Sequence, residues 1–115
     1  MERTKALIVN RTTKTAYLVI PIEFINALKW EKADKIFIAL YDDRIELSKI
    51  LPNMVGQSDL IDINITNLNK SIIRGCDSYR LWFRKELVEN LQILENNLYN
   101  IILQDERIIM KKIEV

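Results

Sequence analysis

The chain has 115 residues, of which 49% are hydrophobic and 29% charged, and its 17 basic side chains nearly balance 16 acidic ones. This composition excludes a disordered chain and indicates one compact domain or two very small ones. The chain has no histidine and one cysteine, Cys76, which excludes an imidazole base, a histidine metal ligand and an internal disulfide framework.

The first part of the chain predicts two strands and a helix. Residues 6–9 and 17–20 are rich in β-branched side chains, and the polar residues 10–15 separate them, so both are predicted strands. Pro21 ends the second strand, and its fixed φ suits the first position of a helix. The spacing of apolar side chains then predicts a short helix over residues 22–28.

A hairpin is predicted after this helix. Its strands are residues 35–41 and 44–50, and the second alternates apolar with polar side chains, as a half-buried strand does. Asp42 and Asp43 form the predicted turn, because aspartate tolerates the positive φ of a two-residue hairpin turn.

A connector and a second set of elements complete the chain. Residues 51–66 contain Pro and Gly, but isoleucines alternate with polar residues over 61–66, which predicts an edge strand within the connector. The order of the first part then returns, with a strand, a helix and a hairpin predicted over 79–83, 84–91, 98–103 and 107–113.

The chain contains an internal repeat. Residues 4–50 lie over 67–113 without a gap, at an offset of 63, and 11 of the 47 pairs are identical. Such a duplication predicts a pseudo-two-fold unit in which each copy covers the apolar face of the other. We therefore divide the chain into a first repeat over 1–50, a connector over 51–66 and a second repeat over 67–115. The predicted core consists of apolar residues at matching places: Leu18, Ile20, Leu28, Ile38, Leu40, Ile45, Leu47, Leu81, Phe83, Leu91, Ile101, Leu103, Ile108 and Met110.

The charge is unevenly distributed along the sequence. Residues 1–15 carry a net +3, residues 70–85 a net +4, and the remainder −6. The two basic segments, called the basic arms below, lead into equivalent parts of the two repeats. A basic bias at equivalent places favours a functional surface over a merely solvated one.

The motif Tyr17-Leu18-Val19-Ile20-Pro21-Ile22-Glu23-Phe24-Ile25-Asn26-Ala27-Leu28, followed by Asp34-Lys35-Ile36 and Asp42-Asp43-Arg44-Ile45-Glu46-Leu47, resembles the AbrB/MazE/SpoVT swapped-hairpin family. The resemblance covers the first repeat and extends to the second through the internal alignment. It implies a mainly β fold with short helices, in which two strand–helix–hairpin repeats form a swapped-hairpin, AbrB-like β-barrel. Tandem members such as the MraZ group carry two units per chain, and here the barrel can close within one chain or between two.

Three positions depart from the family pattern. The usual glycine before the Leu-Val-Ile-Pro strand is Ala16, and the glycine of the Gly-Asp step is Ala33, with Asn96 in the second repeat. The usual helix arginine is Ile25, and Val88 in the second repeat. Loss of this arginine argues against the family's usual DNA contact, and an apolar residue there can instead face another protein surface.

The leading functional hypothesis is a DNA-binding transcriptional regulator or chromatin-like protein. Its partner is double-stranded DNA, since Arg and Lys on strand–loop arms neutralise phosphates and Arg reaches base edges. The alternative is a protein–protein interaction module, antitoxin-like or a scaffold, on the same barrel, and a homodimer is compatible with both. The expected DNA contacts come from the basic arms: Lys5, Arg11, Lys14, Arg74, Arg80, Arg84 and Lys85.

Other chemistry finds little support in the sequence. A lone Cys76 cannot form a zinc site, no glycine-rich phosphate loop exists, and hairpin turns explain the adjacent carboxylates, so we expect no enzyme, metal or cofactor. Without a signal-peptide pattern or an apolar run of about 18 residues, we expect a cytoplasmic protein and no membrane partner. Trp82 and Phe83 favour core packing over a stacking platform for single-stranded nucleic acid, because Val19 and Ile20 occupy the equivalent positions, and Trp30 also favours the core or an interface.

Overall fold

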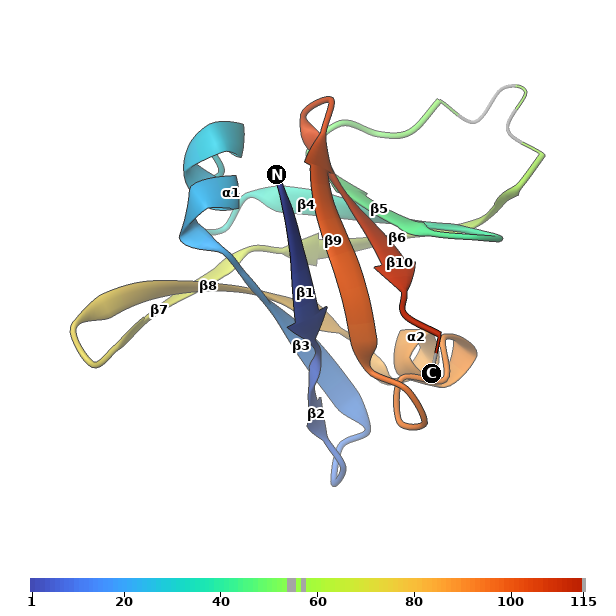
Figure 1. The fold of residues 1–115 in the computed structure, drawn as a ribbon, viewed down its shortest axis with the longest axis horizontal. Coiled ribbons are helices and arrows are strands. Elements are labelled where there is room, and N and C mark those ends of the chain that lie inside the picture. The colour runs from blue at the N-terminus through green and yellow to red at the C-terminus, as the bar shows by residue number, and fades with distance from the viewer. Residues whose placement is uncertain (54–55, 57, 115) are drawn as a thin grey trace.

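The computed structural model describes residues 1–53, 56 and 58–114. It contains two antiparallel β-sheets, and its two short helices lie apart, α1 at the upper left and α2 at the lower right of Figure 1. The fold is therefore mainly β with short helices, as the sequence predicts.

The larger sheet, called sheet A, has six strands in the order β1-β9-β10-β5-β4-β6. All of its neighbouring strands are antiparallel. In the same order, their bounds are β1 (Glu2–Ala6), β9 (Leu98–Gln104), β10 (Arg107–Lys112), β5 (Ile45–Ser48), β4 (Lys35–Tyr41) and β6 (Leu60–Asn67).

The smaller sheet, called sheet B, has four antiparallel strands in the order β2-β3-β8-β7. Each of its two central strands leads directly into one of the helices, and the chain then enters sheet A. The bounds are β2 (Ile8–Asn10), β3 (Thr15–Ile20), α1 (Ile22–Leu28), β7 (Asn69–Ile73), β8 (Cys76–Phe83) and α2 (Lys85–Asn90).

The two halves of the chain exchange strands. β1 of the first half pairs with β9 of the second, and β6 of the second half pairs with β4 of the first. The β3–β8 and β5–β10 ladders also join the halves. The strand order of both sheets is unchanged when the halves are interchanged, so the halves are related by a pseudo-two-fold axis. This axis passes between the paired residues Leu18 and Leu81 in sheet B.

Two buried leucines connect the sheets. Leu7 lies between β1 and β2, Leu68 lies between β6 and β7, and each side chain is 1% exposed. The Leu7 amide donates to the Asn97 carbonyl and the Leu68 amide to the Asp34 carbonyl, both at 2.9 Å. The segment that begins each half, residues 2–10 or 60–73, is called its leading segment below. It contributes one strand to sheet A, bends at its leucine and contributes the next strand to sheet B.

The leading segments correct two sequence-based expectations and confirm a third. The single strand predicted over residues 6–9 is wrong, because β1 ends before Leu7 and β2 begins after it. The expected closed barrel is also not formed: β1 and β6 border sheet A, and β2 and β7 border sheet B, so each sheet has two edges. The edge strand expected within the connector is present as β6.

Strand pairing also shows that the gapless offset of 63 fails in the leading segments. Leu7 and Leu68 occupy equivalent corners, and they are 61 residues apart. The difference arises in the following hairpins. β2–β3 has three ladder pairs and the four turn residues 11–14, whereas β7–β8 has five pairs and the two turn residues 74–75, so the second hairpin is two residues longer.

Local predictions hold best at the helix of the first half and at the strand that follows it. The helix over 22–28 and the strand over 35–41 are confirmed, although Pro21 is the residue before the helix and not its first residue. Asp105 and Glu106 have the expected positive φ, at 51° and 60°. Asp42 and Asp43 do not, so the predicted turn conformation is wrong in the first half.

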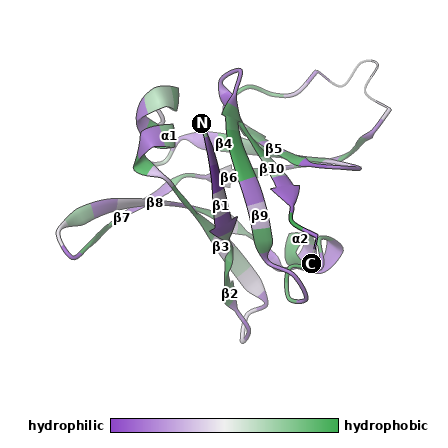
Figure 2. Ribbon diagram, viewed as in Figure 1, coloured by the Kyte–Doolittle hydropathy of each residue, from purple (hydrophilic) through white to green (hydrophobic). Residues whose placement is uncertain are grey.

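The core lies between the inner faces of the two sheets. Burial alternates along strands such as β3, in which Ala16, Leu18 and Ile20 face the core, and Figure 2 shows hydrophobic and hydrophilic residues mixed along the strands. Of the predicted core residues, Leu28, Leu91 and Leu103 are only partly buried and pack against the core, and the others are buried. Ile25 and Val88 are also buried in the core, so the expectation that they face another protein surface is wrong. Trp30 is a core residue, as predicted.

A shared carboxylate lies on the pseudo-two-fold axis in sheet A. Glu46 pairs across the β5–β10 ladder with Ile109, its own counterpart at offset 63. Its Oε2 accepts from Arg44 Nε and its Oε1 from Arg107 Nη1, both at 2.6 Å. Arg44 and Arg107 are themselves counterparts, and Asp43 and Asp59 also pair with Arg44. Although burial opposes it, hydrogen bonds to these three carboxylates raise the pKa of Arg44.

We predict that Glu46→Gln lowers the free energy of unfolding by about 2 kcal/mol. The substitution removes the buried negative charge that two arginines share. Because both arginines are partly exposed to water, the cost is smaller than for breaking a fully buried ion pair. Urea denaturation measures the change, and Glu95→Gln, which changes an exposed glutamate, is the control. Equal effects of the two substitutions would show that the shared carboxylate contributes nothing specific.

We also predict that Ala33→Gly raises the free energy of unfolding by about 0.5–1 kcal/mol. Ala33 has a φ of 70°, a left-handed conformation that disfavours a Cβ atom. Ala27→Gly, in the exposed face of α1, is the matched control and should destabilise the protein by about 1 kcal/mol. Thermal unfolding of both variants checks the two opposite signs.

Candidate nucleic-acid interface

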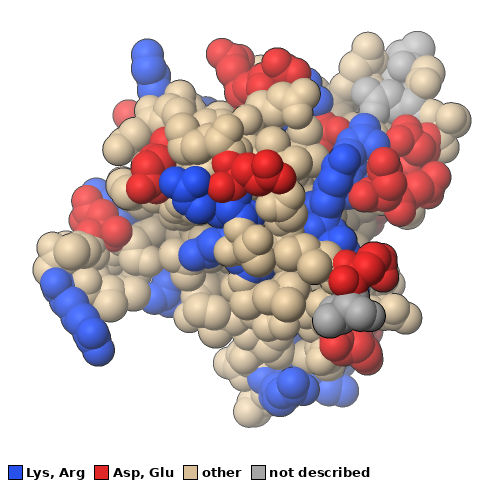
Figure 3. All heavy atoms as spheres, in the orientation of Figure 1, with Lys and Arg blue, Asp and Glu red and all other residues tan. Residues whose placement is uncertain are grey.

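Sheet B and its two hairpin turns concentrate positive charge. Residues 8–20 and 69–83 contain five basic residues and one acidic residue, a net +4, and the rest of the chain carries a net −3. The acid, Asp77, pairs with Lys70 at 3.4 Å. Figure 3 shows basic side chains at both hairpin tips, at the bottom and at the far left of the view. The basic residues of sheet B are Arg11, Lys14, Lys70, Arg74 and Arg80.

Defined turns hold the basic side chains at the two tips. In the β2–β3 turn, Asn10 Oδ1 accepts from the backbone amides of Thr12 and Thr13 at 3.0 and 3.2 Å, and Lys14 has a φ of 59°. In the β7–β8 turn, Arg74 and Gly75 both have positive φ, at 52° and 78°, which is typical of a type I′ turn. Both arginines, Arg11 and Arg74, are exposed on these turns.

The two tips lie at opposite ends of sheet B. β3 and β8 are antiparallel, and each begins at its own hairpin turn. From Cys76 to the Thr15 end of the ladder the distance is about 27 Å, at about 3.4 Å per residue, and the turns extend it further. The sheet therefore presents two separated basic ends with a face between them.

The outer face of sheet B carries an aromatic pair and an arginine, together called the stacking patch: Tyr17, Arg80 and Trp82. Tyr17 and Trp82 are directly opposite each other in the β3–β8 ladder, with ring centroids 4.8 Å apart and planes tilted by 51°. The Arg80 guanidinium lies 4.7 Å from the centroid of the Tyr17 ring. All three side chains are partly exposed, and the buried Nε of Arg80 has no hydrogen-bond partner among the described residues.

The sequence-predicted contact residues fall into two groups. Arg11, Lys14, Arg74 and Arg80 are on sheet B. The other three are elsewhere: Lys5 is half-buried on β1, Arg84 bonds to Asn64 and lies 3.9 Å from Glu86, and Lys85 lies 4.0 Å from Glu89.

Sequence reasoning missed part of this surface. Phe83 is a core residue as predicted, but Trp82 lies outside the core, so the core interpretation is wrong for that residue. Tyr17 was missed altogether. The signal was the antiparallel pairing about Leu18 and Leu81, which places Tyr17 opposite Trp82, whereas a comparison at fixed offset matches Trp82 with Val19.

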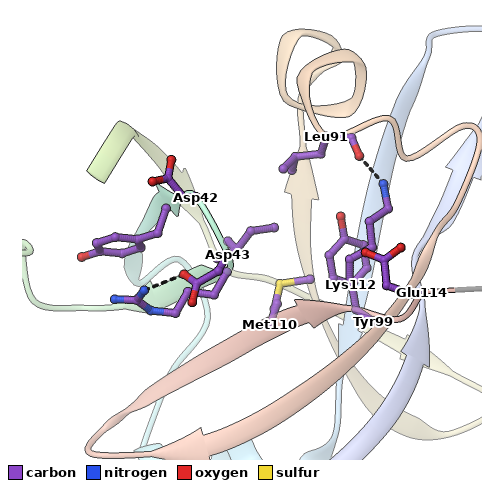
Figure 4. Close-up of a pocket in the computed structure, with 10 residues that line it drawn as sticks. Asp42, Asp43, Leu91, Tyr99, Met110, Lys112 and Glu114 are labelled. Carbon is purple, nitrogen blue, oxygen red and sulfur yellow. Dashed lines mark hydrogen bonds and ion pairs between the residues drawn. The ribbon is translucent and has the colours of Figure 1, made fainter. Parts of the chain in front are cut away.

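A separate pocket of about 370 Å³ lies between the β4–β5 turn and the C-terminal strand (Figure 4). Lys112 Nζ donates to the carbonyl oxygens of Leu91 and Gln92, and Asp43 pairs with Arg44 at 2.8 Å. The hydroxyl of Tyr99 is buried without a hydrogen-bond partner in the described structure, and burial raises the pKa of Tyr99 to about 12. The charged groups of this pocket therefore mainly bond to one another and to backbone carbonyls at the end of α2.

Comparison with protein-family models, with curated proteins and with solved structures finds no match to this chain. Within the described residues, no three His, Cys, Asp or Glu side chains are grouped so that they could hold a metal ion. No helix in the described part of the chain has the length and apolarity needed to span a membrane.

We predict that Tyr99→Phe leaves stability at pH 7 unchanged or slightly higher and reduces the loss of stability at alkaline pH, to which Tyr41, whose pKa burial also raises, contributes as well. The pKa of Tyr99 is raised in the folded state, so its contribution is complete below the unfolded pKa near 10 and is lost as pH rises toward 12. The substitution also deletes a buried hydroxyl that has no described partner. Urea denaturation between pH 7 and pH 11 measures both effects.

The control for this prediction is Tyr17→Phe, which deletes a hydroxyl from a half-exposed ring. This variant should keep the alkaline loss of stability. An unchanged alkaline loss in Tyr99→Phe would contradict the assignment of that loss to Tyr99.

Proposed function

We propose that this protein binds DNA through sheet B and acts as a transcriptional regulator or chromatin-like protein. The observation that carries the proposal is the concentration of a net +4 on one sheet of a chain whose remainder carries −3. Basic side chains neutralise phosphates and release condensed counterions, and this supplies most of non-specific DNA affinity. The negative remainder disfavours other orientations on a polyanion.

The separation of the two basic tips also supports the proposal. The ladder between them is about 27 Å long before the turns are added, close to the 34–36 Å repeat of a DNA helical turn. The pseudo-two-fold axis at the centre of sheet B relates β3 to β8, so the two hairpin turns lie at opposite ends of the sheet, although they differ in length. Two phosphate groups on one side of a duplex suit this spacing.

We further propose that the fold is an open, tandem version of the AbrB-like swapped-hairpin arrangement. The exchange of β1 and β6 between the halves supports this relationship. So does the backbone of Ala33, which adopts a φ of 70° at the place where the family pattern has glycine.

An interaction module that does not bind DNA is the second candidate function, and the exposed edge of sheet A favours it. Ile61 and Ile65 on the outermost strand β6 are 65% and 59% exposed, and an exposed apolar edge strand is a template for pairing with another chain. Such an edge accommodates a second copy of this chain, in a homodimer, or another protein. It carries little positive charge and is separate from the outer face of sheet B.

We predict that the double substitution Arg11→Ala and Arg74→Ala weakens DNA binding and lowers the magnitude of its salt dependence by about two. Each exposed arginine that contacts a phosphate contributes about 0.9 to the slope of log K against log salt. Stability should hardly change, because exposed charges contribute little to it. Fluorescence anisotropy with labelled duplex DNA over a range of salt concentrations measures the slope.

The matched control is Lys32→Ala with Lys111→Ala, which removes the same charge from exposed positions outside sheet B. An equal loss of affinity in the control would show that attraction is diffuse and that sheet B is not the interface. Absence of binding to any duplex at low salt would favour the interaction module.

A further inference from the structure

We propose that the outer face of sheet B binds single-stranded DNA by stacking unpaired bases on Trp82 and Tyr17. This inference rests on the proposed function, because it assigns a preferred form of DNA to the same sheet. It goes further by giving the aromatic residues a role that phosphate contacts cannot supply. The observations concern ring exposure, the charge beside the rings and the space next to Trp82.

The aromatic pair occupies the middle of the sheet and not its edge. Tyr17 and Trp82 are on β3 and β8, the two central strands of sheet B, at directly paired positions. Neither ring belongs to the hydrophobic core, which the inward-facing neighbours Leu18, Leu81 and Phe83 fill. Since the core is complete without them, the rings are available to an external flat apolar group.

A cation without an ion-pair partner among the described residues lies within this aromatic surface. The Arg80 guanidinium is held 4.7 Å from the Tyr17 ring, and no carboxylate lies within salt-bridge distance of it in the described structure. Stacking on the ring restricts the guanidinium and leaves its outer N–H groups free to donate. A fixed, uncompensated guanidinium beside aromatic rings suits a ligand that alternates phosphates with flat bases.

Polar side chains and a hollow surround the stacking patch. The strand register places Asn10, Thr15 and Ser78 on the same face as Tyr17 and Arg80. Asn10 Oδ1 accepts from two turn amides and the Thr15 hydroxyl bonds to Thr13, so the Asn10 amide group and the Ser78 hydroxyl are the polar groups offered to a base edge. A hollow of about 220 Å³ borders Trp82, and its lining includes Thr15 and the exposed Arg84. The hollow offers room for one unpaired base beside the indole, and Arg84, which bonds to Asn64, lies at its border.

The strandedness of the ligand follows from the accessibility of base faces. In a duplex each base is stacked on its neighbours, so side chains on a broad sheet face cannot reach a base plane without unstacking it. In a single strand the base planes are free, and each base that stacks on an aromatic side chain adds affinity. The aromatic pair therefore adds affinity for unpaired bases, and the basic tips serve phosphates in either form.

The decisive experiment uses the two tryptophans as separate reporters. Trp30 is 4% exposed in the core, and Trp82 is on the outer face of sheet B. Trp30→Phe leaves Trp82 as the only indole, and its fluorescence should be quenched saturably by oligothymidine of about 12 nucleotides. Trp82→Phe leaves only Trp30, and its fluorescence should not change. Absence of quenching in the Trp30→Phe protein, while anisotropy reports bound oligothymidine, would overturn the proposal.

Affinity measurements test the same inference without a fluorescent reporter residue. Trp82→Leu should weaken binding of oligothymidine about 5- to 150-fold, the equivalent of one lost stacking contact, and change duplex affinity less than twofold. Trp82→Phe keeps an aromatic ring and should retain most of the single-strand affinity. Near-ultraviolet and far-ultraviolet circular dichroism establish whether each variant is folded. If Trp82→Leu does not fold, the quenching experiment with Trp30→Phe decides between the outcomes.

The outcomes separate this inference from the function on which it rests. If the unmodified protein binds neither duplex nor single strand at low salt, the proposed function fails. If it binds duplex at least as tightly as oligothymidine and Trp82→Leu weakens neither or both equally, the stacking inference fails and DNA binding by sheet B stands. Binding of oligouridine without oligothymidine would also overturn the assignment of DNA as the ligand.

Discussion

The exchange of leading segments between the halves is the constraint on which the rest of the structure depends. Among the described residues, β1 pairs with a single strand, which belongs to the second half, and β6 pairs with a single strand, which belongs to the first. Each leading segment then crosses to sheet B through a fully buried leucine, Leu7 or Leu68. One half alone would leave a hairpin edge unpaired and the inner face of its strands exposed. The core, both sheets and the position of the basic tips therefore form only when the two halves fold together.

A duplicated chain can be asymmetric where a symmetric pair of chains cannot, and Glu46 uses this freedom. A residue on a two-fold axis meets its own copy, so two identical halves would place two carboxylates opposite each other, which is unfavourable. Here the counterpart is Ile109, and the single carboxylate accepts from Arg44 and Arg107, which are identical in both halves. The difference at one position converts a like-charge clash into a shared ion pair. It also makes the two halves complementary to each other within one chain.

The sequence predicted the elements better than their surroundings, for identifiable physical reasons. The helix over 22–28 and the strand over 35–41 follow from local apolar spacing and from Pro21, and they agree with the structure. The bend at Leu7 has no Gly or Pro to mark it, because buried packing and one backbone hydrogen bond produce it.

At the candidate surface, too, the features set by local sequence could be predicted, and those set by strand pairing could not. The basic tips were visible as local charge at Arg11 and Arg74, whereas the outward position of Trp82 depends on which strand lies beside β8. Both tips carry an exposed arginine, although their turns differ in length, and the face between them has lost its symmetry. At offset 63, Tyr17 corresponds to Arg80 and Val19 to Trp82, so the aromatic pair lies on one side of the axis and the Val19–Arg80 pair on the other.

A symmetric face suits a duplex, whose two strands are related by local two-fold axes. A face with distinct sides can bind a single strand in one direction, because such a strand has polarity and no two-fold axis. Divergence of the two halves thus provides what the tips alone do not, namely a means to distinguish the two ends of a bound strand.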